Sequence, residues 1–82
     1  MTKTKIDVTV IEIIAREAKR PAGEITLNTR LDDLGIDSLK AIVILSELED
    51  ILGIEIPNEI LGSINTVGDI VVRIDELQTK LQ

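Results

Sequence analysis

The sequence predicts an all-α fold, a small four-helix bundle with three main helices, one short helix and a long first loop. Three stretches of the chain have apolar residues three and four positions apart, and Pro and Gly interrupt the chain between them. The one short alternating stretch has no evident partner strand. Hydrophobic residues form 44% of the 82 residues, enough for a core, and we expect a single domain over residues 1–82. Because Phe, Tyr and Trp are absent, this core must consist mainly of Ile, Leu and Val.

The first helix is expected over residues 5–19, and a long connection over residues 20–36. Apolar residues with helical spacing predict the buried side of this helix: Ile6, Val10, Ile11, Ile14, Ala15 and Ala18. Pro21 and Gly23 should end it. Four apolar residues can hold the connection against the bundle: Ile25, Leu27, Leu31 and Leu34. A loop this long in so small a domain is usually functional or packed down by its own side chains.

The second helix is expected over residues 38–52, with Asp37 as its N-cap and Gly53 as its stop. One apolar stripe should face the core: Ala41, Ile44, Leu45, Leu48 and Leu52. Leu39, Ile42 and Val43 lie off this stripe beside Ser38. Some of these three side chains must therefore face outward or line a second contact.

After this helix the chain should run extended over residues 54–57, because Pro57 disfavours helix in the residue before it. A short helical turn is expected at residues 58–63. Thr66 should then cap the last helix. Asp69, at the third position of this helix, should interact favourably with the positive end of the helix dipole. The buried face of this helix is expected to contain Val67, Ile70, Val71, Ile74, Leu77 and Leu81.

The composition disfavours a standalone enzyme. The chain has no Cys and no His, which excludes disulfides, Cys-based zinc sites, thiol nucleophiles and the usual general base near neutral pH. Nothing in the sequence resembles a nucleophile–base pair. The N-terminal residues lack the apolar segment of a signal peptide, and no apolar run approaches the length of a membrane span. We therefore expect a cytoplasmic monomer.

The net charge of −6 is concentrated in the middle of the chain. Residues 32–59 contain Lys40 as their only basic residue, and eight acidic residues: Asp32, Asp33, Asp37, Glu47, Glu49, Asp50, Glu55 and Glu59. This charge disfavours nucleic acid as a partner, because phosphates need clustered Lys and Arg. A basic protein surface is the natural complement. Alternatively, the acidic residues form a solvated face that only keeps the domain in solution.

Ser38 is the best candidate for a chemically modified residue. It falls in the first turn of the predicted second helix, where backbone N–H groups lack helical partners and the helix dipole is positive. Both effects would stabilise a phosphate ester on its hydroxyl. Taken alone, Ser38 would be interpreted as an ordinary residue at the start of a helix, where Ser is common.

Four segments in this order resemble the acyl carrier proteins. They are Leu34-Gly35 before Asp37-Ser38-Leu39, an apolar and acidic helix, Ile54-Glu55-Ile56-Pro57, and Asn65-Thr66-Val67-Gly68-Asp69-Ile70. The resemblance covers essentially the whole chain. It implies that a phosphopantetheinyl transferase joins 4'-phosphopantetheine from coenzyme A to Ser38 through a phosphodiester. The thiol of this arm would hold acyl groups as thioesters. By the same resemblance Asp37 and Leu39 belong to the attachment site, where Asp37 would contact the transferase or help to hold a metal ion in that enzyme's active site.

The resemblance also implies that the second helix docks on acyl-loading and acyl-using enzymes with basic surfaces. The candidate partner-binding residues are Leu39, Ile42, Val43, Glu47, Glu49, Asp50, Glu55 and Glu59. For Leu39 and Ile42 the alternative is core packing. A growing acyl chain would lie between the helices, with candidate lining residues Ile44, Leu48, Ile56, Ile64, Val67 and Val71. For each of these the alternative is plain core packing.

The chain departs from the common fatty-acid carriers near Ser38. Lys40 stands where an acidic residue is frequent, Val43 stands where Glu is usual, and the loop before the motif is about one residue shorter. These departures favour a specialised acyl carrier with dedicated enzymes. An aminoacyl or peptidyl carrier is a second hypothesis, although the acidic balance and Ile56-Pro57 favour the acyl branch. An unmodified helical interaction module is the third.

Overall fold

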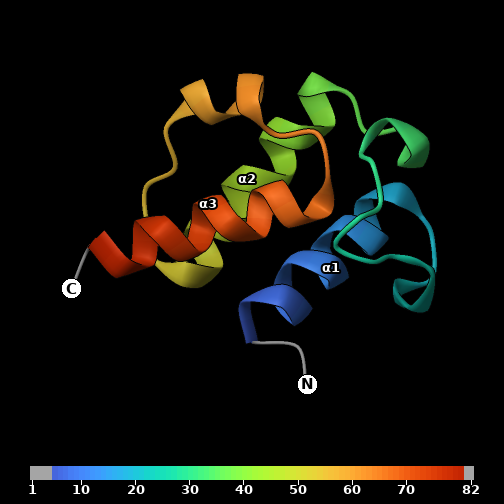
Figure 1. Cartoon of the computed structure of the whole chain (residues 1–82), viewed down its shortest axis with the longest axis horizontal. Helices are drawn as coiled ribbons and strands as arrows, with labels where there is room; N and C mark the ends of the chain where they lie inside the picture. Colours follow the sequence, from blue (N-terminus) through green and yellow to red (C-terminus); the bar gives the residue numbers. More distant parts are fainter. Residues whose placement is uncertain (1–4, 81–82) are drawn as a thin grey trace.

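Three α-helices and three short 3-10 helices follow one another in the computed structural model, which describes residues 5–80, with side chains from residue 6 to residue 78. In chain order they are α1 (Lys5–Ala18), η1 (Ala22–Glu24), η2 (Asp32–Leu34), α2 (Ser38–Leu52), η3 (Asn58–Ser63) and α3 (Val67–Lys80). Figure 1 shows α1 beside both α2 and α3, and η3 in the long arc between α2 and α3. Within residues 5–80 no segment forms a strand, so the predicted all-α fold is confirmed.

The core is aliphatic and draws on every long helix. Its largest fully buried side chains are Ile14, Ile25, Ile44, Leu48, Ile70, Ile74, Val10 and Val67. Burying one such side chain contributes about 1.5–3 kcal/mol, so this cluster supplies much of the drive to fold. The predicted stripes are confirmed in outline. Some of their members are only half-buried, namely Ile6, Ala18, Leu52, Val71 and Leu77, and Ile13 is buried although it lay outside the expected face. Leu81 lies outside the described residues.

The ends of α1 and α2 are both set by a residue in the left-handed region. Gly53 has φ 67° and its N–H donates to the Glu49 carbonyl at 2.9 Å, so the predicted stop of α2 is confirmed. Lys19 has φ 58°, and the N–H of Arg20 donates to Ala15 O at 3.0 Å. Helix α1 therefore ends one residue before the predicted boundary. Its stop is the backbone of Lys19, while Pro21 comes later, directly before η1.

The long connection is packed down on the bundle rather than irregular. It contains η1 and η2, which the sequence did not indicate, and its side chains Ile25, Leu31 and Ile36 are buried. Three backbone hydrogen bonds join it to the start of α3: Leu31 N–H to Asn65 O at 2.9 Å, Val67 N–H to Thr29 O at 3.0 Å, and Gly68 N–H to Leu27 O at 2.8 Å. The loop carbonyls thus accept amide hydrogens that have no partner inside the helix.

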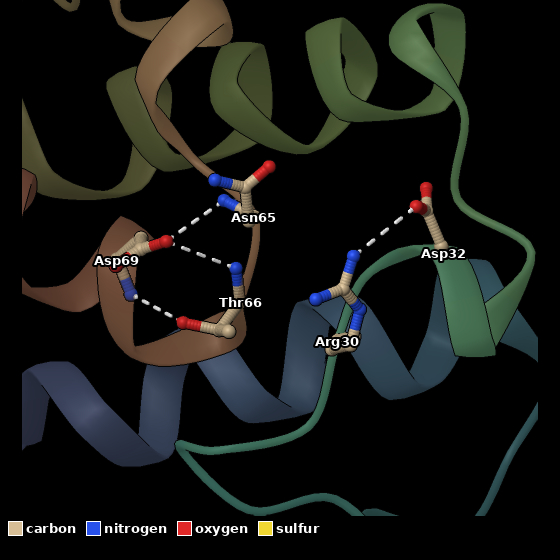
Figure 2. A network of polar contacts seen from close by, with 5 residues as sticks. All are labelled: Arg30, Asp32, Asn65, Thr66 and Asp69. Carbon is tan, nitrogen blue, oxygen red and sulfur yellow. Dashed lines mark hydrogen bonds and ion pairs between the residues drawn. The ribbon is translucent and has the colours of Figure 1, made fainter.

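A reciprocal cap begins α3, as Figure 2 shows. The carboxylate of Asp69 accepts the N–H groups of Asn65 at 2.8 Å and Thr66 at 3.1 Å, while the Thr66 hydroxyl accepts the N–H of Asp69 at 3.2 Å. The hydrogen bonds from the backbone of Asn65 and Thr66 lower the pKa of Asp69 below its ordinary value. The predicted cap at Thr66 is confirmed, and Asp69 completes it.

Candidate functional site

Ser38 is the first residue of α2, and its side chain is exposed. Asp37 is the N-cap: its backbone is extended, and its Oδ1 accepts the N–H of Lys40 at 2.9 Å. The carbonyl of Asp37 accepts the N–H of Ala41 at 2.9 Å, which starts the helical pattern. The predicted capping role of Asp37 is confirmed. A side chain placed after such a cap lies at the positive end of the helix dipole.

The buried residue Ile36 fixes where the chain reaches this exposed position. Gly35 ends η2 with φ 73°, a conformation that favours glycine. The next residue, Ile36, is buried, and its N–H donates to Leu31 O at 3.0 Å. Because Ile36 is held inside, the following Asp37 and Ser38 emerge at the surface at a defined point.

A pocket of about 310 Å³ opens beside Ser38, where η2, the start of α2 and the end of η3 meet. Its lining residues are Leu31, Asp32, Ile36, Asp37, Ser38, Ala41, Leu61, Ile64 and Asn65. Five of these are apolar. Figure 2 shows two of the polar ones, Asp32 on η2 and Asn65 just before α3. Asp32 also pairs with Arg30, at 3.7 Å between Oδ2 and Nη2, and both partners are exposed.

Only one of the six residues expected to line an acyl chain contributes to this pocket, namely Ile64. Ile44, Leu48 and Val67 are fully buried in the core, Ile56 is buried, and Val71 is half-buried. The sequence analysis did not select the other apolar lining residues: Leu31, Ile36, Ala41 and Leu61. Ile36 and Ala41 could have been found from their closeness to Ser38 along the chain. Leu31 and Leu61 reach the site only through folding.

The outer face of α2 is apolar near Ser38. Leu39, Ile42 and Val43 are 74%, 41% and 45% exposed, respectively. Leu39 and Ile42 are therefore not packed in the core, and the alternative stated for them is wrong. Exposed apolar side chains grouped in this way on a helix are typical of a contact surface.

Two of the acidic residues expected on the docking surface have internal partners. Glu47 forms an ion pair with Arg16 of α1. Glu49 Oε2 accepts the N–H of Ile56 at 2.7 Å, which ties the extended segment 54–57 to α2. Asp50, Glu55 and Glu59 are exposed. The five carboxylates therefore do not form one uniform patch.

The arrangement can hold a phosphate ester. The chain contains neither His nor Cys, and the neighbouring Asp37 carboxylate is engaged as the helix cap. The start of α2 provides N–H groups and a positive dipole, and both suit an anion on Ser38. The exposed hydroxyl and the adjacent pocket leave room for a long substituent.

None of the helices described between residues 5 and 80 combines the length and the apolar character needed to cross a membrane.

Comparison with known proteins identifies this kind of site. Residues 8–74 match the family described as the phosphopantetheine attachment site. The chain is 43% identical over 67 residues to the acyl carrier protein of Streptococcus pyogenes serotype M3 and 42% identical to that of Streptococcus pneumoniae serotype 4. Each match covers 82% of this chain and 88% of the relative. It is also 41% identical over 59 residues to orsellinic acid synthase of Beauveria bassiana, covering 72% of this chain and 3% of that protein. The chain therefore belongs to the acyl carrier protein family, whose domains bear a covalently attached 4'-phosphopantetheine.

Proposed function

We propose that Ser38 bears the 4'-phosphopantetheine and that this protein carries acyl groups in fatty-acid or polyketide synthesis without catalysing their chemistry. The observation that carries the proposal is the position of Ser38. Its side chain is exposed at the capped N-terminus of α2, beside a pocket lined by five apolar and four polar residues. The similarity to acyl carrier proteins over most of the chain supports the class of cargo.

Residues around Ser38 would have distinct tasks. Asp37 holds the first turn of α2 in place, and the buried Ile36 fixes where that turn reaches the surface. The N–H groups and the dipole of α2 stabilise the negative charge of the phosphodiester. When attached, the arm supplies the thiol on which acyl groups are held as thioesters. Leu31, Leu61 and Ile64 offer apolar surface to the part of the cargo that turns toward the protein.

The absence of His and Cys from the chain leaves the chemistry to partner enzymes. Leu39, Ile42 and Val43 would form the apolar part of their contact with the carrier, while Asp50, Glu55 and Glu59 would meet basic side chains. Lys40 and Val43 support a specialised carrier with its own enzymes, because they put a positive and a neutral side chain next to Ser38. A single domain, a monomeric state and a cytoplasmic location stay predictions. Sedimentation and fractionation of the host cell would test the last two.

Intact-mass measurement after treatment with a promiscuous phosphopantetheinyl transferase and coenzyme A tests the attachment site. The unmodified protein should gain the mass of one 4'-phosphopantetheinyl group, and Ser38→Ala should gain nothing. Ser46→Ala is the matched control, because Ser46 is another exposed serine of α2 and its loss should leave the gain unchanged. A gain retained in Ser38→Ala would move the site elsewhere. No gain in the unmodified protein would favour the interaction module.

The cargo class requires a second measurement. The holo-protein should be incubated with ligases for fatty acids and, separately, with ligases for amino acids, followed by intact-mass readout. Acyl transfer from fatty-acid ligases alone would support the acyl carrier. Transfer from amino-acid ligases alone would identify an aminoacyl carrier and contradict the proposal.

A further inference from the structure

We infer, on the basis of the proposed attachment at Ser38, that the first part of the 4'-phosphopantetheine rests in the pocket beside this serine and that Asn65 holds it there. This part of the arm directly follows the phosphate. It contains a carbon that bears two methyl groups, then a hydroxyl and an amide. The segment is uncharged, and its apolar and polar groups lie side by side.

The composition of the pocket suits such a segment. Leu61 and Ile64 belong to its apolar lining, and its charged lining residues, Asp32 and Asp37, are both acidic. The exposed ion pair of Asp32 with Arg30 offsets little of this negative charge. A further anionic group is therefore disfavoured in the pocket. A neutral segment with methyl groups and hydrogen-bonding groups fits both kinds of wall.

The backbone of Asn65 is fixed in the wall of this pocket from two sides. Its N–H donates to the Asp69 carboxylate at 2.8 Å, and its carbonyl accepts the N–H of Leu31 at 2.9 Å. Leu31 is itself a lining residue, so the second hydrogen bond joins two walls of the pocket. Residue 65 is therefore held in place by atoms that do not belong to its side chain.

The side-chain amide of Asn65 is left available for a ligand. In Figure 2 the dashed lines from the Asp69 carboxylate reach backbone N–H groups, and none reaches this amide. Within residues 6–78 no other group forms a hydrogen bond with it. An asparagine amide both donates and accepts hydrogen bonds, so it can pair with the amide or the hydroxyl of the arm, whereas the carboxylates of Asp32 and Asp37 only accept.

These contacts give each group at the start of the arm a place. The phosphodiester lies at the first turn of α2, where N–H groups and the helix dipole favour an anion. The methyl groups lie against Leu61 and Ile64, and the amide or the hydroxyl pairs with Asn65. The arm thereby rests in the pocket rather than on the outer face of α2 until a partner enzyme draws it out. Asn65 is a positioning residue, because the chemistry takes place at the distant thiol.

NMR of the holo-protein tests this placement, after intact-mass measurement has verified loading. The two methyl groups of the arm should show NOEs to the methyl groups of Leu61 and Ile64, and the side-chain NH2 signals of Asn65 should differ from those of the apo-protein. Asn65→Ala should lower the ratio of resting to released arm, measured from these NOEs, about fivefold, the effect of one hydrogen bond. Asn58→Ala is the matched control, because Asn58 is an exposed asparagine of η3 outside the pocket lining, and it should leave the NOEs unchanged.

A second variant separates hydrogen bonding from shape. Asn65→Asp keeps the size of the side chain but removes its donors and adds a negative charge, so it should release the arm at least as much as Asn65→Ala. Circular dichroism should show the same helix content in every variant, because the hydrogen bonds that fix residue 65 use its backbone.

Three outcomes would count against these assignments. Unchanged NOEs in Asn65→Ala would overturn the role of Asn65. A loaded protein whose arm contacts Leu39 instead of Leu61 and Ile64 would overturn the placement in the pocket and leave the attachment at Ser38 intact. Failure to load the unmodified chain would instead refute that attachment.

Discussion

At the level of single residues, Asp69 makes the stability of the start of α3 depend on pH. Its carboxylate accepts two backbone N–H groups, and these bonds hold its pKa below the ordinary value. A group whose pKa is lower in the folded protein stabilises the fold at neutral pH, and this stabilisation is lost as the pH falls through that pKa. Asp69→Asn should therefore lower the free energy of unfolding by about 1 kcal/mol at pH 7. Urea titration followed by circular dichroism measures it.

In acid, the parent protein and Asp69→Asn should become similar in stability. As the pH falls below about 4, the difference in stability between the parent protein and Asp69→Asn should shrink, because the parent carboxylate becomes protonated. Asp33→Asn, at an exposed position of η2, is the control and should show little difference at either pH. A difference for Asp69→Asn that stays constant from neutral pH into acid would contradict the role of the charge.

Gly68 is required for space rather than for an unusual backbone angle. A Cβ at this position would lie 2.9 Å from the carbonyl oxygen of Leu27, which already accepts the N–H of Gly68. Gly68→Ala should push the loop away from α3 and cost about 1–3 kcal/mol. Thermal unfolding followed by circular dichroism would show the loss as a lower Tm. Gly62→Ala is the control, because beyond its neighbours in the chain no atom lies within 4 Å of its added Cβ, and a loss as large there would count against the steric explanation.

At the level of elements, the end of α1 is less stable than it could be. Lys19 adopts φ 58°, which costs an L-residue about 1–2 kcal/mol and costs glycine almost nothing. Lys19→Gly should therefore raise stability by up to about 1 kcal/mol, the remainder being offset by the greater freedom of glycine in the unfolded chain. Chemical denaturation measures the gain. Lys19→Ala separates conformation from charge, and an equal gain in that variant would contradict the argument from φ.

At the level of the whole molecule, stability should depend on ionic strength. The chain carries a net charge of −6, and the ion pairs Arg30–Asp32 and Arg73–Glu76 are largely exposed, so they offset little of the repulsion. Raising NaCl from about 0.05 to 0.5 M should increase Tm by several degrees, because salt screens the repulsion among the acidic residues. Asp33→Asn combined with Glu59→Gln should show a smaller increase. A Tm that falls with added NaCl would contradict this prediction.

Several features could be predicted from the sequence because they depend on neighbours in the chain. The boundaries of α2, its cap at Asp37 and its stop at Gly53 each need only a few consecutive residues. The cap at Thr66 has the same local character. The apolar spacing of the long helices selected most of the buried residues, because helical periodicity puts them on one face.

The remaining features depend on which distant segments meet, and only the tertiary structure decided them. The pocket beside Ser38 combines Leu31, Leu61 and Asn65, which no local pattern connects. Arg16 with Glu47, and Glu49 with the Ile56 N–H, join residues whose pairing follows from how the helices and loop pack. Local spacing specifies helices and their ends, whereas the positions of side chains between elements follow from packing the whole core at once.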